Sequence, residues 1–330
     1  MQNESGLIRL GAIILVAILG LGAVAWGSGL GSHGSGTEAR AETPVLLASR
    51  DVGRDEDAAP GPADDAVCRV EGEPIALPQA VHEASGVALG RGGVLWTHSD
   101  AGQPEVLAVS ADGQVRGTVR IAGASAVDWE DIAVGPCASG SCLYVGDIGD
   151  NNASRDHITV YRVPEPDPAA GTSAPAEAFH ASYPDGPQDA EALFVDGDGR
   201  IYVVTKGETG PIAVYRFPDA PGGTARLERV KVLSTDKVSR SERVTGADRS
   251  PDGRWVALRT LKSVSFYPAG AVTGGAAGEP TRFDLSAADE AQGEGIALGA
   301  NGEVFLTSEG GKKKNPATLT RATCPLPALR

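Results

Sequence analysis

Short apolar runs alternate with turns rich in Asp and Gly along the C-terminal part of the chain, and residues 189–208 show this unit most plainly. An apolar run at 192–195 leads into the turn Asp-Gly-Asp-Gly, and a β-branched and aromatic run at 201–204 follows it. This pattern predicts a β-hairpin. Glu191 opens the hairpin, and Lys206 and Glu208 close it.

The same unit recurs when the chain is aligned on the acidic residue that opens the hairpin. The opening positions are Glu83, Glu130, Glu191, the neighbourhood of Thr245, and Glu294. The second strand begins 11, 13, 10, 10 and 10 residues later, at Val94, Leu143, Ile201, Trp255 and Val304. A nearly constant internal offset with variable spacing between units indicates one repeated module with insertions in its loops. Repeats of about 40 to 60 residues made of short strands predict an all-β fold, a β-propeller.

Five units predict five blades. The first four supply four strands each and the fifth supplies three, so the segment from Val67 to Leu77 is expected to add the fourth strand of the last blade. Such a pairing of an N-terminal strand with the last blade is how propellers close their ring. Six blades are the alternative, if residues 156–187 contain a degenerate repeat.

The N-terminal part of the chain predicts a targeting element. Residues 10–30 carry no charge, and this stretch is long enough to span a bilayer. Residues 1–30 are therefore interpreted as a transmembrane anchor or, with the small residues Ala23 to Ala25 as a cleavage site, as a signal peptide. Residues 31–65 are rich in Gly, Ala, Ser, Asp and Pro and predict a flexible linker, and residues 66–330 form the propeller domain. We expect a single-pass protein of the cell membrane, whose propeller lies outside the cytoplasm, or alternatively a secreted protein.

The four cysteines support an oxidising compartment. Cys137 and Cys142 bracket a four-residue turn and would close a small ring across one hairpin. Cys68 precedes the first unit and Cys324 follows the last, where the two ends of a propeller meet. Two disulfides are therefore predicted. A four-cysteine metal site is the competing interpretation, but these spacings match no zinc pattern.

Charge and motifs exclude several classes of function. The formal net charge of −14 argues against nucleic-acid binding, because few basic groups remain to neutralise phosphates. The chain has no GxSxG, HExxH or P-loop sequence, so a serine hydrolase, a zincin and a nucleotidase lack their usual motifs.

The predicted fold places the candidate site on one face, here called the top face, where the inner strand of each blade begins and its neighbour ends. Glutamates gathered there around one axis would repel one another, and a hard cation such as Ca²⁺ is their natural counter-charge. The predicted metal ligands are Glu83, Glu130, Asp147, Asp150, Glu191, Glu294 and Glu309. The candidate catalytic residues, from the ends of second strands, are Lys206, Arg259 and His98. Alternatively, the glutamates only accept backbone hydrogen bonds from neighbouring blades.

The units DAEALFVDGDGRIYVVTKGE and GEGIALGANGEVFLTSEGG resemble those of the bacterial phytase-like β-propellers, which include the esterase-like phytases. The resemblance covers roughly residues 81–309 and implies a Ca²⁺-binding top face and phosphoester hydrolysis. By position, Glu191, Glu294 and Glu309 match the acidic positions of that family, and Lys206 matches a position that is often acidic or polar. The chain departs from the family in showing five units rather than six and few basic residues on the predicted top face, which argues against a highly anionic substrate such as phytate.

Two functions follow. The favoured one is a binding module without catalysis, whose acidic top face binds a cation, a small molecule, a glycan or a protein. The alternative is a Ca²⁺-dependent phosphoester hydrolase, in which Glu130, Asp147, Glu191 and Glu294 hold the ion while Lys206 and Arg259 stabilise the phosphoryl oxygens.

Overall fold

The computed structural model describes residues 67–81, 83–219, 224–275, 277–311 and 315–326. The predicted anchor or signal peptide at 1–30 and the predicted linker at 31–65 lie outside these ranges and stay predictions. No helix within the described ranges is long and apolar enough to cross a membrane.

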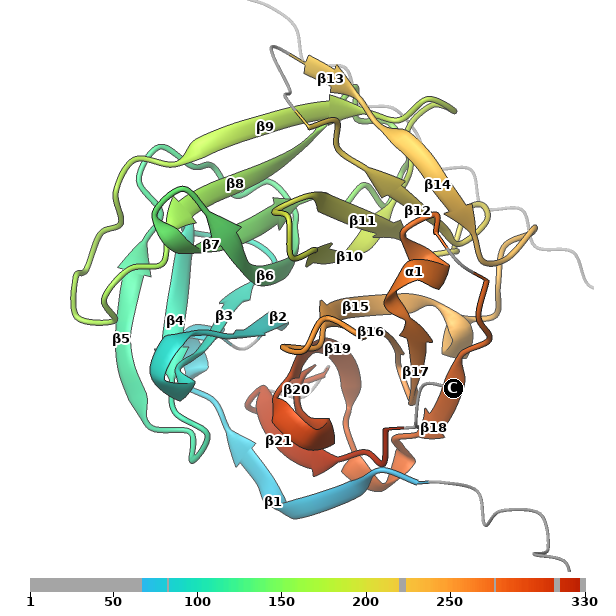
Figure 1. Ribbon diagram of the computed structural model, residues 1–330. Coiled ribbons are helices and arrows are strands. Elements are labelled where there is room, and N and C mark those ends of the chain that lie inside the picture. Colours follow the sequence, from blue (N-terminus) through green and yellow to red (C-terminus); the bar gives the residue numbers. More distant parts are fainter. Residues whose placement is uncertain (1–66, 82, 220–223, 276, 312–314, 327–330) are drawn as a thin grey trace, which may run out of the picture. The chain divides into compact units, whose positions relative to one another are not determined.

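Five sheets surround a central axis as the blades of a propeller (Figure 1), which confirms the predicted fold class and blade number. From the centre outwards, blade 1 consists of β2 (Ala84–Leu89), β3 (Leu95–Ser99), β4 (Glu105–Val109) and β5 (Val115–Arg120). Blade 2 consists of β6 (Trp129–Cys137), β7 (Gly140–Asp147), β8 (Ile158–Pro164), β9 (Glu177–Ser182) and the short β13 (Thr224–Arg226). Blade 3 consists of β10 (Ala190–Val195), β11 (Ile201–Thr205), β12 (Ala213–Arg216) and β14 (Glu228–Val232).

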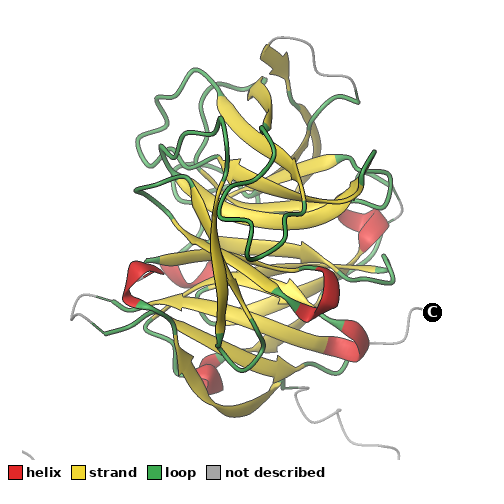
Figure 2. Ribbon diagram, turned by 90° about the vertical axis from the view of Figure 1, so that its left-hand side faces the viewer, coloured by secondary structure: helices red, strands yellow, loops and turns green. Residues whose placement is uncertain are grey.

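Blade 4 consists of β15 (Val244–Arg249), β16 (Trp255–Thr260), β17 (Ser263–Pro268) and β18 (Thr281–Asp284). Blade 5 consists of β19 (Gln292–Leu298), β20 (Glu303–Glu309), β21 (Thr318–Thr323) and β1 (Arg69–Ala76). The α-helix α1 (Ala269–Val272) is a single turn, and Figure 2 shows the described helical segments as short pieces between strands.

The six-blade alternative is wrong. Residues 156–187 supply β8 and β9, the outer strands of blade 2, and a long connection between them that forms a bridge from Thr172 to Arg120 in blade 1. The extra strand β13 pairs in parallel with β9 before the chain returns to blade 3 through β14. The length of this region therefore comes from a five-stranded blade and its connection.

The ring closes as predicted. β1 pairs with β21 in an antiparallel register that sets Arg69 opposite Thr323. Beside this pairing, Cys68 and Cys324 form a disulfide across a sequence separation of 256 residues. Cys137 and Cys142 form the second predicted disulfide. The two ends of the propeller are thus joined by strand pairing and by a covalent bond.

The inner strands are buried on both faces, because each blade packs against two neighbours. All six residues of β10 are buried, whereas only Val119 is buried in the outer strand β5. This explains why inner strands appear in the sequence as continuous apolar runs and outer strands do not. The five inner strands β2, β6, β10, β15 and β19 contact one another in a closed cycle around the axis.

Candidate functional site

Each inner strand carries a β-bulge near its start. In blade 3, Ala190 pairs with Thr205 and Ala192 pairs with Val204, so Glu191 is an extra residue. The pairing register also shifts near the start of the other four inner strands, across one residue in blades 2 and 4 and across two residues in blades 1 and 5. A bulge breaks the alternation of side chains and re-aims the extra residue. The bulge residues of blades 1 to 5 are Ser85, Glu130, Glu191, Thr245 and Glu294.

These five residues line one cavity of about 340 Å³ on the top face, here called the ring cavity. Its other lining residues are Asp100, Asp128, Asn151, Lys206, Arg240, Arg243, Leu261, Gln292 and Glu309. Leu261 is the one aliphatic side chain among these residues, and none of the described residues that line the cavity is aromatic. The lining therefore suits a hydrophilic ligand.

The prediction that Glu83 opens the first repeat is wrong. In blade 1 the bulge holds Ser85, and Glu83 lies two residues before it. The corresponding positions of the other blades, two residues before each bulge residue, are Asp128, Asp189, Arg243 and Gln292. Glu83 thus belongs to a second polar ring. The sequence held a better signal, since Gly86-Val-Ala-Leu aligns with Gly295-Ile-Ala-Leu and pairs Ser85 with Glu294.

The two bulge hydroxyls tie neighbouring blades together. Ser85 Oγ donates to the carbonyl oxygen of Glu130 at 2.5 Å, and Thr245 Oγ1 donates to that of Glu294 at 3.0 Å. Gly295 follows the bulge in blade 5, where an added Cβ would lie 2.6 Å from the carbonyl oxygen of Ser85. Such a close approach of backbones requires glycine.

Glu191 is paired inside the cavity. Lys206, the first residue after β11, donates to Glu191 Oε1 and lies 3.6 Å from Asp189 Oδ2. Burial alone would lower the pKa of Lys206, but Glu191 and Asp189 raise it above its usual value, so the ammonium stays charged. Burial, opposed by Lys206, raises the pKa of Glu191 to about 7.

Glu294 and Glu309 share one amide. Gln292 Nε2 donates to Glu294 Oε1 at 2.7 Å and to Glu309 Oε1 at 2.9 Å. Burial and the nearby Glu191 carboxylate raise the pKa of Glu294 well above its usual value. The glutamate of blade 5 is therefore hydrogen-bonded, and burial favours its protonated form.

Glu130 differs from the other two bulge glutamates. Glu130 is buried, with a relative exposure of 7%. Within the described residues, no hydrogen bond or ion pair reaches its carboxyl group. An added Cβ on Gly149 would lie 2.4 Å from Glu130 Oε1 and 2.5 Å from Asp128 Oδ2, so these two oxygens are close neighbours. Burial and the carboxylates of Glu191 and Asp128 raise the pKa of Glu130 well above its usual value. A buried acid that has no partner among the described residues thus faces the ring cavity.

Two candidate catalytic residues do not line the ring cavity. Arg259 is fully buried, donates to the carbonyl oxygens of Gly295 and Thr307, and pairs with Glu290. It joins blade 4 to blade 5. His98 packs edge-on against Trp129 with ring centroids 5.7 Å apart, and burial lowers its pKa to about 4.

Two predicted metal ligands organise loops instead. Asp147 Oδ1 lies 2.8 Å from Arg155 and also accepts the backbone N–H of Asp128. Asp150 Oδ2 accepts the backbone N–H groups of Ser154 and Arg155 at 2.7 and 2.8 Å. Neither residue lines the ring cavity, which leaves Glu130, Glu191, Glu294 and Glu309 of the predicted ligands. Within the described residues, no three His, Cys, Asp or Glu side chains are arranged to hold a metal ion.

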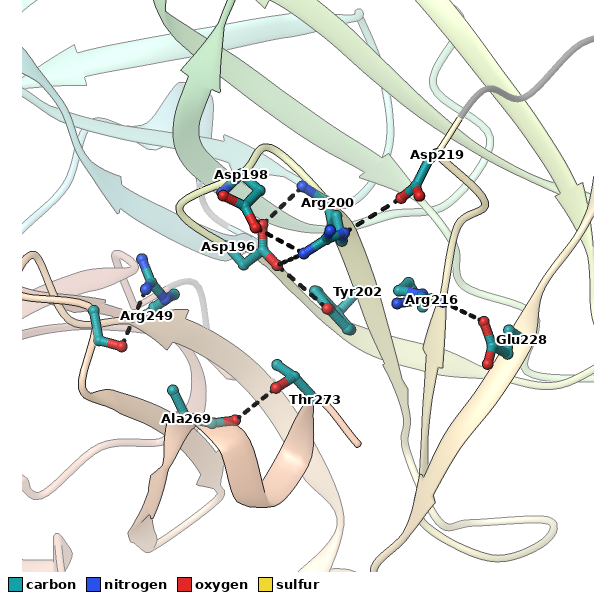
Figure 3. A network of polar contacts seen from close by, with 11 residues as sticks. Asp196, Asp198, Arg200, Tyr202, Arg216, Asp219, Glu228, Arg249, Ala269 and Thr273 are labelled. Carbon is teal, nitrogen blue, oxygen red and sulfur yellow. Dashed lines mark hydrogen bonds and ion pairs between the residues drawn. The ribbon is translucent and has the colours of Figure 1, made fainter. Parts of the chain in front are cut away.

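The Asp-Gly turn of blade 3 lies at the other end of its hairpin, and its carboxylates bind groups of the same blade. In blade 3, Asp196 Oδ1 accepts the backbone N–H groups of Asp198 and Arg200, and Arg200 pairs with both carboxylates (Figure 3). Tyr202 donates to Asp196 Oδ2 at 3.3 Å. These carboxylates are occupied by their own turn, as the Asp-Gly sequence predicts.

Sequence reasoning found Lys206 but missed the other two basic residues of the cavity. Arg240 and Arg243 come from the connection between β14 and β15, whose 3₁₀ segment spans Arg240–Glu242. Arg240 has no equivalent position in the repeats of the other blades, so the repeat could not reveal it. Arg243 could have been found as the blade 4 member of the second polar ring.

Comparisons with known proteins find likeness only at the level of three-dimensional structure. No protein-family model matches the chain, and no curated protein matches it. Among solved structures, the PQQ-bound aldose sugar dehydrogenase from Streptomyces coelicolor is similar with a TM-score of 0.48 and 14% identity, over 78% of this chain and 98% of that one. XC5397 from Xanthomonas campestris, a gluconolactonase, is similar with a TM-score of 0.43 and 15% identity, over 81% and 99%. At these scores the likeness assigns no activity to this chain.

Proposed function

We propose that the protein is a binding module whose ring cavity takes a small hydrophilic ligand with a positive charge. The observation that carries this proposal is the carboxyl group of Glu130, which is buried, faces the cavity, and has no partner within the described residues. The carboxyl group of Asp128 lies beside it and also has no hydrogen-bond or ion-pair partner within the described residues, so the two acids together offer a place for one cation.

We expect a proton on Glu130 to take the place of that cation when no ligand is bound. An ionised, unpaired carboxylate is costly to bury, and the raised pKa of Glu130 shows that its protonated form is favoured. A bound cation would stabilise the ionised form and release the proton, as ligand binding to acids generally does. Binding is therefore expected to strengthen as the pH rises.

The location of this module is also a proposal. Two disulfides suit a protein that folds in an oxidising compartment. Together with the uncharged stretch at residues 10–30, they support a propeller outside the cytoplasm, attached to the membrane or secreted.

Ca²⁺-dependent phosphoester hydrolysis, which the phytase-like resemblance implies, is the second candidate. Lys206 favours it, because its charged ammonium group lines the cavity and could stabilise phosphoryl oxygens there. Arg259 cannot stabilise a phosphoryl group from its enclosed position, and the carboxyl groups of the described residues form no three-ligand set for a metal. The carboxylate oxygens of the cavity are ligands of the chemical type that Ca²⁺ prefers.

Isothermal titration calorimetry of the full-length protein in mild detergent tests the proposal. CaCl₂ and methylammonium chloride are the probes, and Glu130→Gln is compared with Glu177→Gln, which makes the same change on the exposed strand β9 of the same blade. We expect at least one cation to bind saturably, Glu130→Gln to weaken it tenfold or more, and Glu177→Gln to leave it unchanged. Absence of binding by both cations, or equal binding by Glu130→Gln, would overturn the proposal.

A further inference from the structure

The ring cavity has an acidic side and a basic side. The basic residues come from adjacent blades, with Lys206 after β11 of blade 3 and Arg240 and Arg243 before β15 of blade 4. In a ring of five blades, blade 1 lies opposite the seam between blades 3 and 4, with blades 2 and 5 beside it (Figure 1). Those three blades supply the carboxyl groups of Asp100, Asp128, Glu130, Glu294 and Glu309.

The basic side has donors that the protein does not use. Nη1 of Arg243 lies 2.8 Å from Glu208 Oε1, but its Nε is buried and has no hydrogen-bond partner within the described residues. The guanidinium group of Arg240 makes no ion pair within the part of the chain that the structure describes. Lys206, by contrast, is held by Glu191. A guanidinium group matches a carboxylate in geometry and binds it through two parallel hydrogen bonds.

The acidic side is open at one place. Glu294 and Glu309 are bridged by Gln292, whereas Glu130 and Asp128 face the cavity without such a bridge. An ammonium group can donate to both of these carboxyl groups at once, since it has three donors. The unused acceptors and the unused donors thus lie on opposite sides of one cavity.

We propose that the ligand of the ring cavity is a small zwitterion, with an ammonium group against Glu130 and Asp128 and a carboxylate against Arg240 and Arg243. This inference rests on the proposed function, because it assumes that a cationic group binds at Glu130. Six carboxyl groups and three basic groups line the cavity, so an anionic end with one charge is favoured over a phosphate dianion. A volume of about 340 Å³ suits a molecule of the size of an amino acid.

Calorimetry of the full-length protein with glycine, β-alanine and 4-aminobutanoate tests the inference, with methylammonium and acetate as probes of each charge alone. These three zwitterions differ in the spacing between their charges. Arg240→Gln removes the exposed guanidinium group, which makes no ion pair with any described residue, and Arg254→Gln makes the same change in the turn of the β15–β16 hairpin, outside the cavity.

We expect the best zwitterion to bind at least tenfold more tightly than methylammonium or acetate. Arg240→Gln should remove that advantage without weakening the binding of methylammonium, while Arg254→Gln should behave as the parent. If methylammonium or Ca²⁺ binds through Glu130 but no zwitterion binds more tightly, or if Arg240→Gln retains the advantage, the inference is overturned and the proposed function stands. If no cation and no zwitterion binds, both are overturned.

Discussion

Asp131 follows the bulge of blade 2 and joins three blades at the axis. Its Oδ2 accepts the backbone N–H groups of Leu193 in blade 3 at 2.8 Å and of Ala247 in blade 4 at 3.1 Å, and its Oδ1 accepts that of Ile132 at 2.9 Å. The side chain is fully buried. In Asp131→Ala, the two donors from other blades would lose their acceptor in a place that water does not reach.

Each unsatisfied buried donor costs about 1–3 kcal/mol, so the two together predict a loss of about 2–6 kcal/mol in the free energy of unfolding. Burial also raises the pKa of Asp131 well above its usual value, against the effect of its backbone hydrogen bonds, so removing the carboxyl group recovers part of this cost. Asp131→Asn should fall between alanine and the parent, because its amide oxygen can still accept from Leu193 and Ala247.

Urea unfolding of the full-length protein, followed by tryptophan fluorescence, measures these differences. Asp219→Ala is the matched control, since Asp219 makes one exposed ion pair with Arg200 at 3.3 Å and should change stability by about 1 kcal/mol or less. If Asp131→Ala unfolds within about 0.5 kcal/mol of the parent, Asp131 does not join the blades and our account of the axis is refuted.

Three further predictions follow from the same structure. Burial raises the pKa values of Glu191 and Asp248 to about 7, so the folded protein holds protons that the unfolded chain has released above about pH 4.5. Stability should therefore fall between about pH 4.5 and 7. Urea midpoints that are equal or higher at pH 7 than at pH 5 would contradict this. Replacing Cys68 and Cys324 by serine should lower the free energy of unfolding by about 5 kcal/mol in the chain-entropy treatment, against about 2 kcal/mol for Cys137 and Cys142. The two values differ because the sequence separations are 256 and 5 residues. Thermal unfolding of the two double variants should show this order. Gly149→Ala should weaken cation binding in calorimetry, because its Cβ would enter the space beside Glu130 and Asp128, and unchanged affinity would show that this space is not the site.

The propeller could be predicted from the sequence because its repeat leaves a strong local record. Buried inner strands give apolar runs such as 192–195, turns give Asp-Gly pairs, and the offset between the two strands is nearly constant. The closing strand β1 and the disulfide between Cys68 and Cys324 follow from the need to join the two ends of a ring.

The site could be predicted only in part, because a bulge changes which residue faces the axis. Glu130, Glu191 and Glu294 occupy bulges and were found as repeat anchors, whereas Glu83 precedes its bulge by two residues. Arg259 lies in register with the other blades but points between blades 4 and 5, where Glu290 pairs with it. Arg240 comes from a connection that the repeat does not include, so no periodic signal marks it.

In the proposed function, Glu130 in the ring cavity holds a proton until a cationic ligand binds. Calorimetric titration of the full-length protein with the tighter of Ca²⁺ and methylammonium, at pH 7 in two buffers with different ionisation enthalpies, measures binding and proton release together. We predict that binding releases protons and that this release is lost in Glu130→Gln. Binding without proton release, or the same release in the variant, would contradict the account.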